Sequence, residues 1–133
     1  MSGEGEKRAG QAGPADDAPA AAEPVDLGHL ARYTLGDAAL EREVLELFCS
    51  QSMTYLERLR TASSDKEWGD IAHSLKGSAR SVGAWRVARA AERAEALRLD
   101  SPDGEKVAHI DELDASLKEA DAYIRSVFVA RGA

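Results

Sequence analysis

His73 is the residue whose type and position most clearly indicate chemistry in this sequence. It lies in a segment, residues 68–83, whose apolar residues recur at three- and four-residue steps, which predicts a helix with one buried face. That face comprises Trp68, Ile71, Ala72, Leu75, Ala79 and Val82. At about 100° per residue, His73 points roughly 150° away from the centre of this face, so we expect a solvent-facing imidazole. A neutral imidazole is a nucleophile at physiological pH, which makes His73 a candidate phosphoryl acceptor.

Gly77 lies one turn after His73, on the same outward face. A glycine inside a helix costs about 0.5–1 kcal/mol relative to alanine, and an outward position gains nothing from packing. We therefore expect Gly77 to leave room beside His73 for a docking surface. Lys76 and Arg80 flank the same side, and the Lys76 ammonium can offset charge on phosphoryl oxygens. Taken singly, each of these residues is more often an ordinary surface residue.

The elements that must position this segment are predicted to be helices. We expect them over about 26–34, 38–61, 65–82 and 84–99, with a last one that begins at Ser101 and Pro102 and runs to about 128. Asp26 is a candidate cap for the first helix, and Val25 and Leu30 can form a hydrophobic staple there. Short connections favour antiparallel neighbours. The predicted fold is all-α, an up-and-down antiparallel four-helix bundle with a short additional N-terminal helix.

Capping residues are predicted at both ends of the helix that contains His73. Ser64 and Glu67 have the S-x-x-E spacing of a capping box, and Gly83 is a plausible stop.

The other helices also have predicted apolar faces. That of helix 38–61 comprises Leu40, Val44, Leu47, Phe48, Tyr55, Leu56 and Leu59, and its outer face includes Glu41, Arg42, Glu46, Glu57 and Arg58. The next helix has a small-residue inner face, Val87, Ala88, Ala91, Ala94 and Leu97, which would let a neighbour come close. The last has the clearest stripe, Ile110, Leu113, Leu117, Ala120, Ile124, Val127 and Phe128.

The amino-acid composition limits the classes of function that this chain could have. The 133 residues carry a formal net charge of −7, and the chain offers no basic footprint for nucleic acid. Residues 1–24, rich in glycine, alanine and proline, are predicted to be a disordered tail, and residues 25–130 the bundle domain. With the single cysteine Cys49 no intramolecular disulfide can form, and no His/Cys cluster has metal-site spacing. Because no membrane span or secretory signal is evident, we expect a cytoplasmic protein.

The segment AHSLKGSA, residues 72–79, resembles the A-H-x-L-K-G-S-[SA] signature of histidine phosphotransfer (Hpt) domains. Val82-Gly83-Ala84 is similar to the apolar-G-A that follows in the family. Further on, Val87, Ala91 and Ala94-Glu95 occupy places where the family often has a leucine, another apolar residue and Leu-Glu. The alanines depart from that pattern and suggest a tighter fourth helix. The motif is fairly specific, whereas the likeness of the remaining helix layout, from about Val25 to Phe128, is not.

The resemblance implies a phosphoryl carrier of two-component phosphorelays. His73 would accept a phosphoryl group, on Nε2, from the aspartate of a response-regulator receiver domain and pass it to another receiver. Lys76 would assist electrostatically, and Gly77 would give access. Ser74, Arg80 and Arg86 are candidate partner-binding residues by proximity. The implied partners are receivers and a hybrid histidine kinase, and the magnesium ion belongs to the receiver, so no cofactor or metal is expected on this chain.

The sequence lacks the motifs of several other functions. Neither a G-x-x-x-x-G-K-[ST] loop nor a glycine-rich kinase loop occurs, so phosphorylation from ATP is not expected. A histidine-kinase dimerisation helix usually has an acidic residue after its histidine, where this chain has Ser74, and we expect a monomer. Two alternatives stay open: an Hpt-like bundle that binds receivers without being phosphorylated, and an unrelated structural bundle. His29 and His109 have no motif around them, and Trp85 could cover the end of the bundle or touch a partner.

Overall fold

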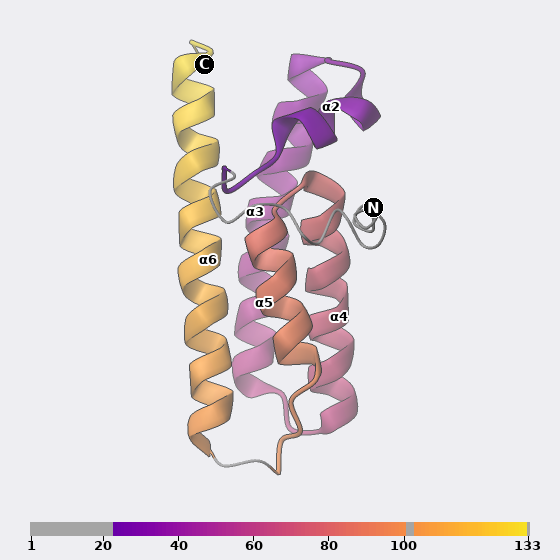
Figure 1. Cartoon of the computed structure of the whole chain (residues 1–133), viewed down its shortest axis with the longest axis vertical. Coiled ribbons are helices and arrows are strands. Elements are labelled where there is room, and N and C mark those ends of the chain that lie inside the picture. Colours follow the sequence, from indigo (N-terminus) through magenta and orange to yellow (C-terminus); the bar gives the residue numbers. More distant parts are fainter. Residues whose placement is uncertain (1–22, 101–102, 133) are drawn as a thin grey trace, which may run out of the picture.

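The computed structural model describes residues 23–100 and 103–132. This part of the chain consists of five helices and contains no strand (Figure 1): α2 (Leu27–Thr34), α3 (Ala38–Thr61), α4 (Asp65–Val82), α5 (Trp85–Glu95) and α6 (Asp103–Ala130). The predicted tail falls almost wholly outside the described residues, as do Ser101 and Pro102. None of the described helices is long and apolar enough to cross a membrane.

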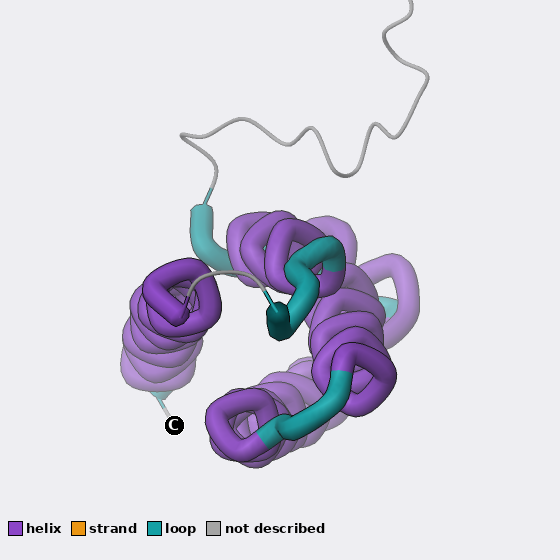
Figure 2. Tube along the Cα trace, turned by 90° about the horizontal axis from the view of Figure 1, so that it is seen from below, coloured by secondary structure: helices purple, strands orange, loops and turns teal. Residues whose placement is uncertain are grey.

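Four of the helices form the predicted bundle. Along the chain α3, α4, α5 and α6 alternate in direction, and each contacts the next, while α6 also returns to α3 (Figure 1). Seen end-on, the four surround a common centre (Figure 2). The short α2 packs across α3 and α4 at one end. This arrangement confirms the expected all-α bundle with an extra N-terminal helix.

The predicted caps form at both ends of α4. Ser64 Oγ accepts a hydrogen bond from the Glu67 backbone N–H, and the Glu67 carboxylate accepts one from the Ser63 N–H. Gly83 ends the helix in the left-handed region, with φ of +80°. A Cβ there would lie 2.8 Å from the Asp26 carbonyl oxygen, so both conformation and space require glycine.

Trp85 covers the end of the bundle. Its side chain is buried, and its Nε1–H donates a 3.2 Å hydrogen bond to the Asp26 carboxylate. The ring also packs edge-on against His29 of α2. Asp26 caps α2 as predicted, by accepting from the His29 backbone N–H. The N-terminal segment is thereby fixed to the turn between α4 and α5.

The face of α3 was only partly predicted. Its buried residues are Glu41, Leu45, Phe48, Ser52, Leu56 and Leu59, which keep three- and four-residue spacing. Leu40 and Leu47, expected inside, are exposed, and Glu41, expected outside, is buried. Because α3 is rich in leucine, its sequence allows more than one phase for the apolar stripe, and contacts with α2 and α6 select among them.

The helix α5 is shorter than expected. It ends at Glu95 instead of continuing to about Leu99. The Asp65 carboxylate accepts a 2.7 Å hydrogen bond from the Leu99 N–H and forms an ion pair with Arg98. These contacts hold the segment after α5 against the start of α4 and outweigh the local helical preference. Leu97 is buried as predicted, but outside the helix.

A buried polar cluster joins α2, α3 and the end of α6. Glu41 is only 4% exposed, and its carboxylate accepts hydrogen bonds from the Thr34 hydroxyl at 3.1 Å and the Arg131 guanidinium at 2.9 Å. A buried carboxylate needs such partners, because removing one leaves an uncompensated charge. The last residues of the described chain therefore help to hold the short N-terminal helix in place.

We expect Arg131→Ala to lower the free energy of unfolding by about 1–3 kcal/mol, because the Glu41 carboxylate loses its charged partner inside the protein. Urea denaturation measures this change. Arg125→Ala is the matched control, since Arg125 pairs with Asp121 on the exposed surface of α6, just before Arg131, and its loss should cost at most about 0.5 kcal/mol. Equal losses in the two variants would show that the Glu41 cluster contributes nothing special.

Candidate functional site

His73 lies in the middle of α4 and faces solvent. Its side chain is 68% exposed, while the flanking residues Ala72 and Leu75 are fully buried. All six residues predicted for the inner face of this helix are buried. The helical phase is therefore as predicted, and the imidazole stands on the outer surface of a helix whose opposite face is anchored in the core.

A carboxylate from α5 holds the imidazole. Glu95 Oε2 lies 3.1 Å from His73 Nδ1, and Glu95 Oε1 lies 2.8 Å from Lys76 Nζ. The Lys76 side chain is only 15% exposed and that of Glu95 30%, so the ion pair is partly buried. Glu95 thus bridges the two residues that the sequence singled out.

The packing of α4 against α5 explains why Glu95 reaches this position. The two helices contact each other, and both contribute small residues to the core, among them Ala72 and Ala79 of α4 and Ala91 and Ala94 of α5, all essentially buried. In addition, Trp68 Nε1–H donates a buried 2.6 Å hydrogen bond to the carbonyl oxygen of Ala94. This bond fixes the last turn of α5 against α4, directly beside Glu95.

The surroundings of Glu95 favour its ionised form. The hydrogen bond from Lys76 is the largest influence and lowers the pKa of the Glu95 carboxyl; burial acts against it, and the contact with His73 lowers the pKa further. An ionised carboxylate can only accept hydrogen bonds. His73 Nδ1 must therefore carry the proton of this contact, which leaves the lone pair of a neutral ring on Nε2.

The space around Gly77 is open. A Cβ built at this position would meet no atom within 4 Å, and the residue is exposed. The prediction that Gly77 points outward is confirmed. The proposal that its small size serves access to His73 stays a prediction.

Glu95 is the functional side chain that sequence reasoning missed. In the sequence, Glu95 was noted only as part of the Ala94-Glu95 pair that resembles the family pattern, and no function was predicted for it. A usable signal existed, because an antiparallel α4–α5 pair brings the end of α5 beside the first half of α4. Sequence alone did not fix which residue of that last turn faces His73.

The candidate docking residues are not gathered around His73. Ser74 is exposed and lines a shallow hollow of about 340 Å³ between α3 and α4. Arg80 lies two turns further along α4 and is partly buried. Arg86 lies at the opposite end of α5 from Glu95 and pairs with Glu119 of α6 at 2.6 Å. The structure therefore brings Lys76 to His73 but not Arg86.

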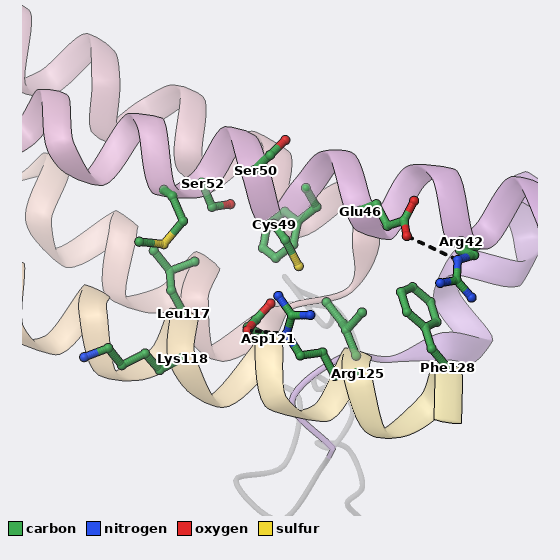
Figure 3. A pocket seen from close by; sticks show the side chains of 13 residues that line it. Arg42, Glu46, Cys49, Ser50, Ser52, Leu117, Lys118, Asp121, Arg125 and Phe128 are labelled. Carbon is green, nitrogen blue, oxygen red and sulfur yellow. Dashed lines mark hydrogen bonds and ion pairs between the residues drawn. The ribbon is translucent and has the colours of Figure 1, made fainter. Parts of the chain in front are cut away.

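A second hollow, of about 550 Å³, lies between α3 and α6 (Figure 3). Its lining includes no residue of α4 or α5, so it is separate from His73. Cys49 points from α3 toward Asp121 and Arg125 of α6 (Figure 3). Burial, together with the neighbouring Asp121 carboxylate, raises the pKa of the Cys49 thiol to about 12. The thiol is therefore protonated at neutral pH and a poor nucleophile.

Within the described ranges no group of three or more His, Cys, Asp or Glu side chains could hold a metal ion.

We expect Glu95→Gln to lower the urea midpoint at neutral pH, because the ammonium of the largely buried Lys76 side chain loses its counter-ion. The folded-state pKa of Glu95 lies below its ordinary value of 4.5, so its contribution to stability is present above about pH 4.5 and is lost as the pH falls through the folded pKa. The difference in stability between wild type and variant should therefore shrink as the pH falls below 4.5. Glu57→Gln, at an exposed ion pair with Arg60, is the control. A difference independent of pH would contradict the ionic role of Glu95.

Comparison with known proteins agrees with this geometry. The family model described as "Hpt domain" matches residues 43–123, more than half of the chain, from the first half of α3 to near the end of α6. Neither the curated proteins nor the solved structures gave a significant match. The match includes His73, Lys76, Gly77 and Glu95. The chain belongs to the Hpt domain family, with a general role in histidine phosphotransfer within phosphorelays, where it interacts with receiver domains and kinases.

Proposed function

We propose that His73 accepts a phosphoryl group from the aspartyl phosphate of one receiver domain and passes it to the aspartate of another. The observation that supports this most is the Nδ1 contact with Glu95 on an imidazole that is 68% exposed. The contact occupies one ring nitrogen and leaves the other, Nε2, as the nucleophile. An Hpt domain with this arrangement needs no general base, since no proton has to leave Nε2.

The transfer balances without further reactants. The Nε2 lone pair forms the N–P bond while the P–O bond to the receiver aspartate breaks, and the electron pair returns to that aspartate as a carboxylate. The imidazole keeps its Nδ1–H and becomes a phosphoimidazolium, whose positive charge lies beside the Glu95 carboxylate. In the reverse sense, a second receiver's aspartate attacks phosphorus and His73 leaves as a neutral imidazole.

Lys76 and Gly77 have supporting roles in this proposal. The Lys76 ammonium keeps Glu95 ionised through their 2.8 Å contact, and it can also offset charge on the phosphoryl oxygens. Gly77 keeps the approach to the imidazole open. The magnesium ion that phosphoryl transfer commonly requires is proposed to be held by the receiver. In-line transfer then depends on how closely the two domains can approach.

The direct test incubates the purified chain with phosphorylated receiver domains and measures acid-labile, base-stable phosphate on it. Wild type should be labelled, and His73→Gln should not. His109→Gln is the matched control and should be labelled as wild type. Label on the His73→Gln variant would assign the phosphate to another residue, and no label on wild type from a panel of receivers would remove the carrier function.

A second test addresses access. Gly77→Glu should leave the bundle folded by circular dichroism, because a side chain at this position meets open space. Transfer from the receiver should still slow by about tenfold or more, since the added side chain crowds the approach and repels an acidic receiver site. Unfolding of this variant, or transfer at the wild-type rate, would contradict the access role.

A further inference from the structure

Gly69 is a second glycine in the interior of α4, one turn before His73. It has an ordinary helical backbone rather than a positive φ, and a Cβ at this position would meet no atom within 4 Å. Neither a turn, a close helix contact nor backbone strain therefore calls for glycine here. Since glycine destabilises a helix interior relative to alanine, its presence is unexplained by the fold.

Helix geometry favours a His73 side chain that leans toward this glycine. Side chains on an α-helix lean toward its N-terminus. By this general preference we expect the His73 imidazole to lean toward the turn that contains Gly69.

The molecular surface is also hollowed on this half of α4. The shallow concavity between α3 and α4 is lined by residues of the first half of α4, up to Ser74, and by Tyr55 and Arg58 of α3. It lies on the same half of the helix as Gly69. Neither Gly69 nor His73 lines this concavity, so it adjoins the approach to the imidazole without forming part of it.

We propose that Gly69 is a docking position for the receiver domain, equivalent to Gly77 on the other side of His73. The two glycines leave a bare strip of helix backbone one turn before and one turn after the imidazole. The receiver surface around its phosphorylated aspartate seats on this strip, and clearance at Gly69 lets that aspartate reach Nε2. This inference rests on the proposed phosphoryl transfer to His73.

The test compares Gly69→Ala and Gly69→Gln with wild type, using the receiver that labels wild type fastest. Both variants should fold, with urea midpoints no lower than wild type. The second-order rate constant of transfer should fall by about tenfold or more for Gly69→Gln, and by less for Gly69→Ala. Gly104→Gln is the matched control, because Gly104 is an exposed glycine of α6 whose Cβ would also meet nothing. It should transfer as wild type.

A small phosphoryl donor distinguishes an effect on receiver docking from an effect on the reactivity of His73. Phosphoramidate needs no docking surface, so it should label His73 in Gly69→Gln and in wild type at the same rate. A parallel loss with phosphoramidate would place the effect on the imidazole itself and overturn the docking role. Wild-type transfer by Gly69→Gln would overturn it as well, with the phosphotransfer function intact. Absence of receiver transfer in wild type would instead remove the proposed function on which the inference rests.

Discussion

The close packing of α4 against α5 is the constraint from which the site follows. Alanines on both helices let the backbones approach, and the Trp68 indole fixes the last turn of α5 through the Ala94 carbonyl. Glu95 then lies where its two oxygens meet His73 and Lys76. A bulkier residue in place of one of these alanines would push α5 away from α4. It would thereby move the Glu95 carboxylate away from His73, although neither residue is changed. The alanines are thus part of the functional geometry.

The site divides into a fixed side and an open side. On the fixed side, Glu95, paired with Lys76, holds one nitrogen of the ring. On the open side, the exposed imidazole stands between positions where added side chains would meet empty space. This division suits a group that must be presented in one orientation to different partners. A carrier of this kind contributes orientation, while we propose that the partner contributes the metal ion and the acidic pocket.

The sequence predicted the fold class, four of the helix beginnings and the inner face of α4, because caps and periodicity are local signals. It predicted the face of α3 only in part, since Glu41 is buried by a pairing with Arg131, ninety residues away. The early end of α5 likewise depends on Asp65, on another helix. For the site, the exposure of His73 and the outward direction of Gly77 followed from helical geometry. The contact of Glu95 did not, because it requires the register between two helices.

The central claim is that Glu95 holds Nδ1–H of His73 and leaves Nε2 free to react. Long-range ¹H–¹⁵N NMR of the histidine side chains tests this in the unphosphorylated chain, at a pH where the ring is neutral, with His73→Gln to assign the signals. We predict that His73 is the Nδ1–H tautomer and that Glu95→Gln weakens this preference. An Nε2–H tautomer in wild type would contradict it, because the nitrogen proposed to attack phosphorus would then carry the proton.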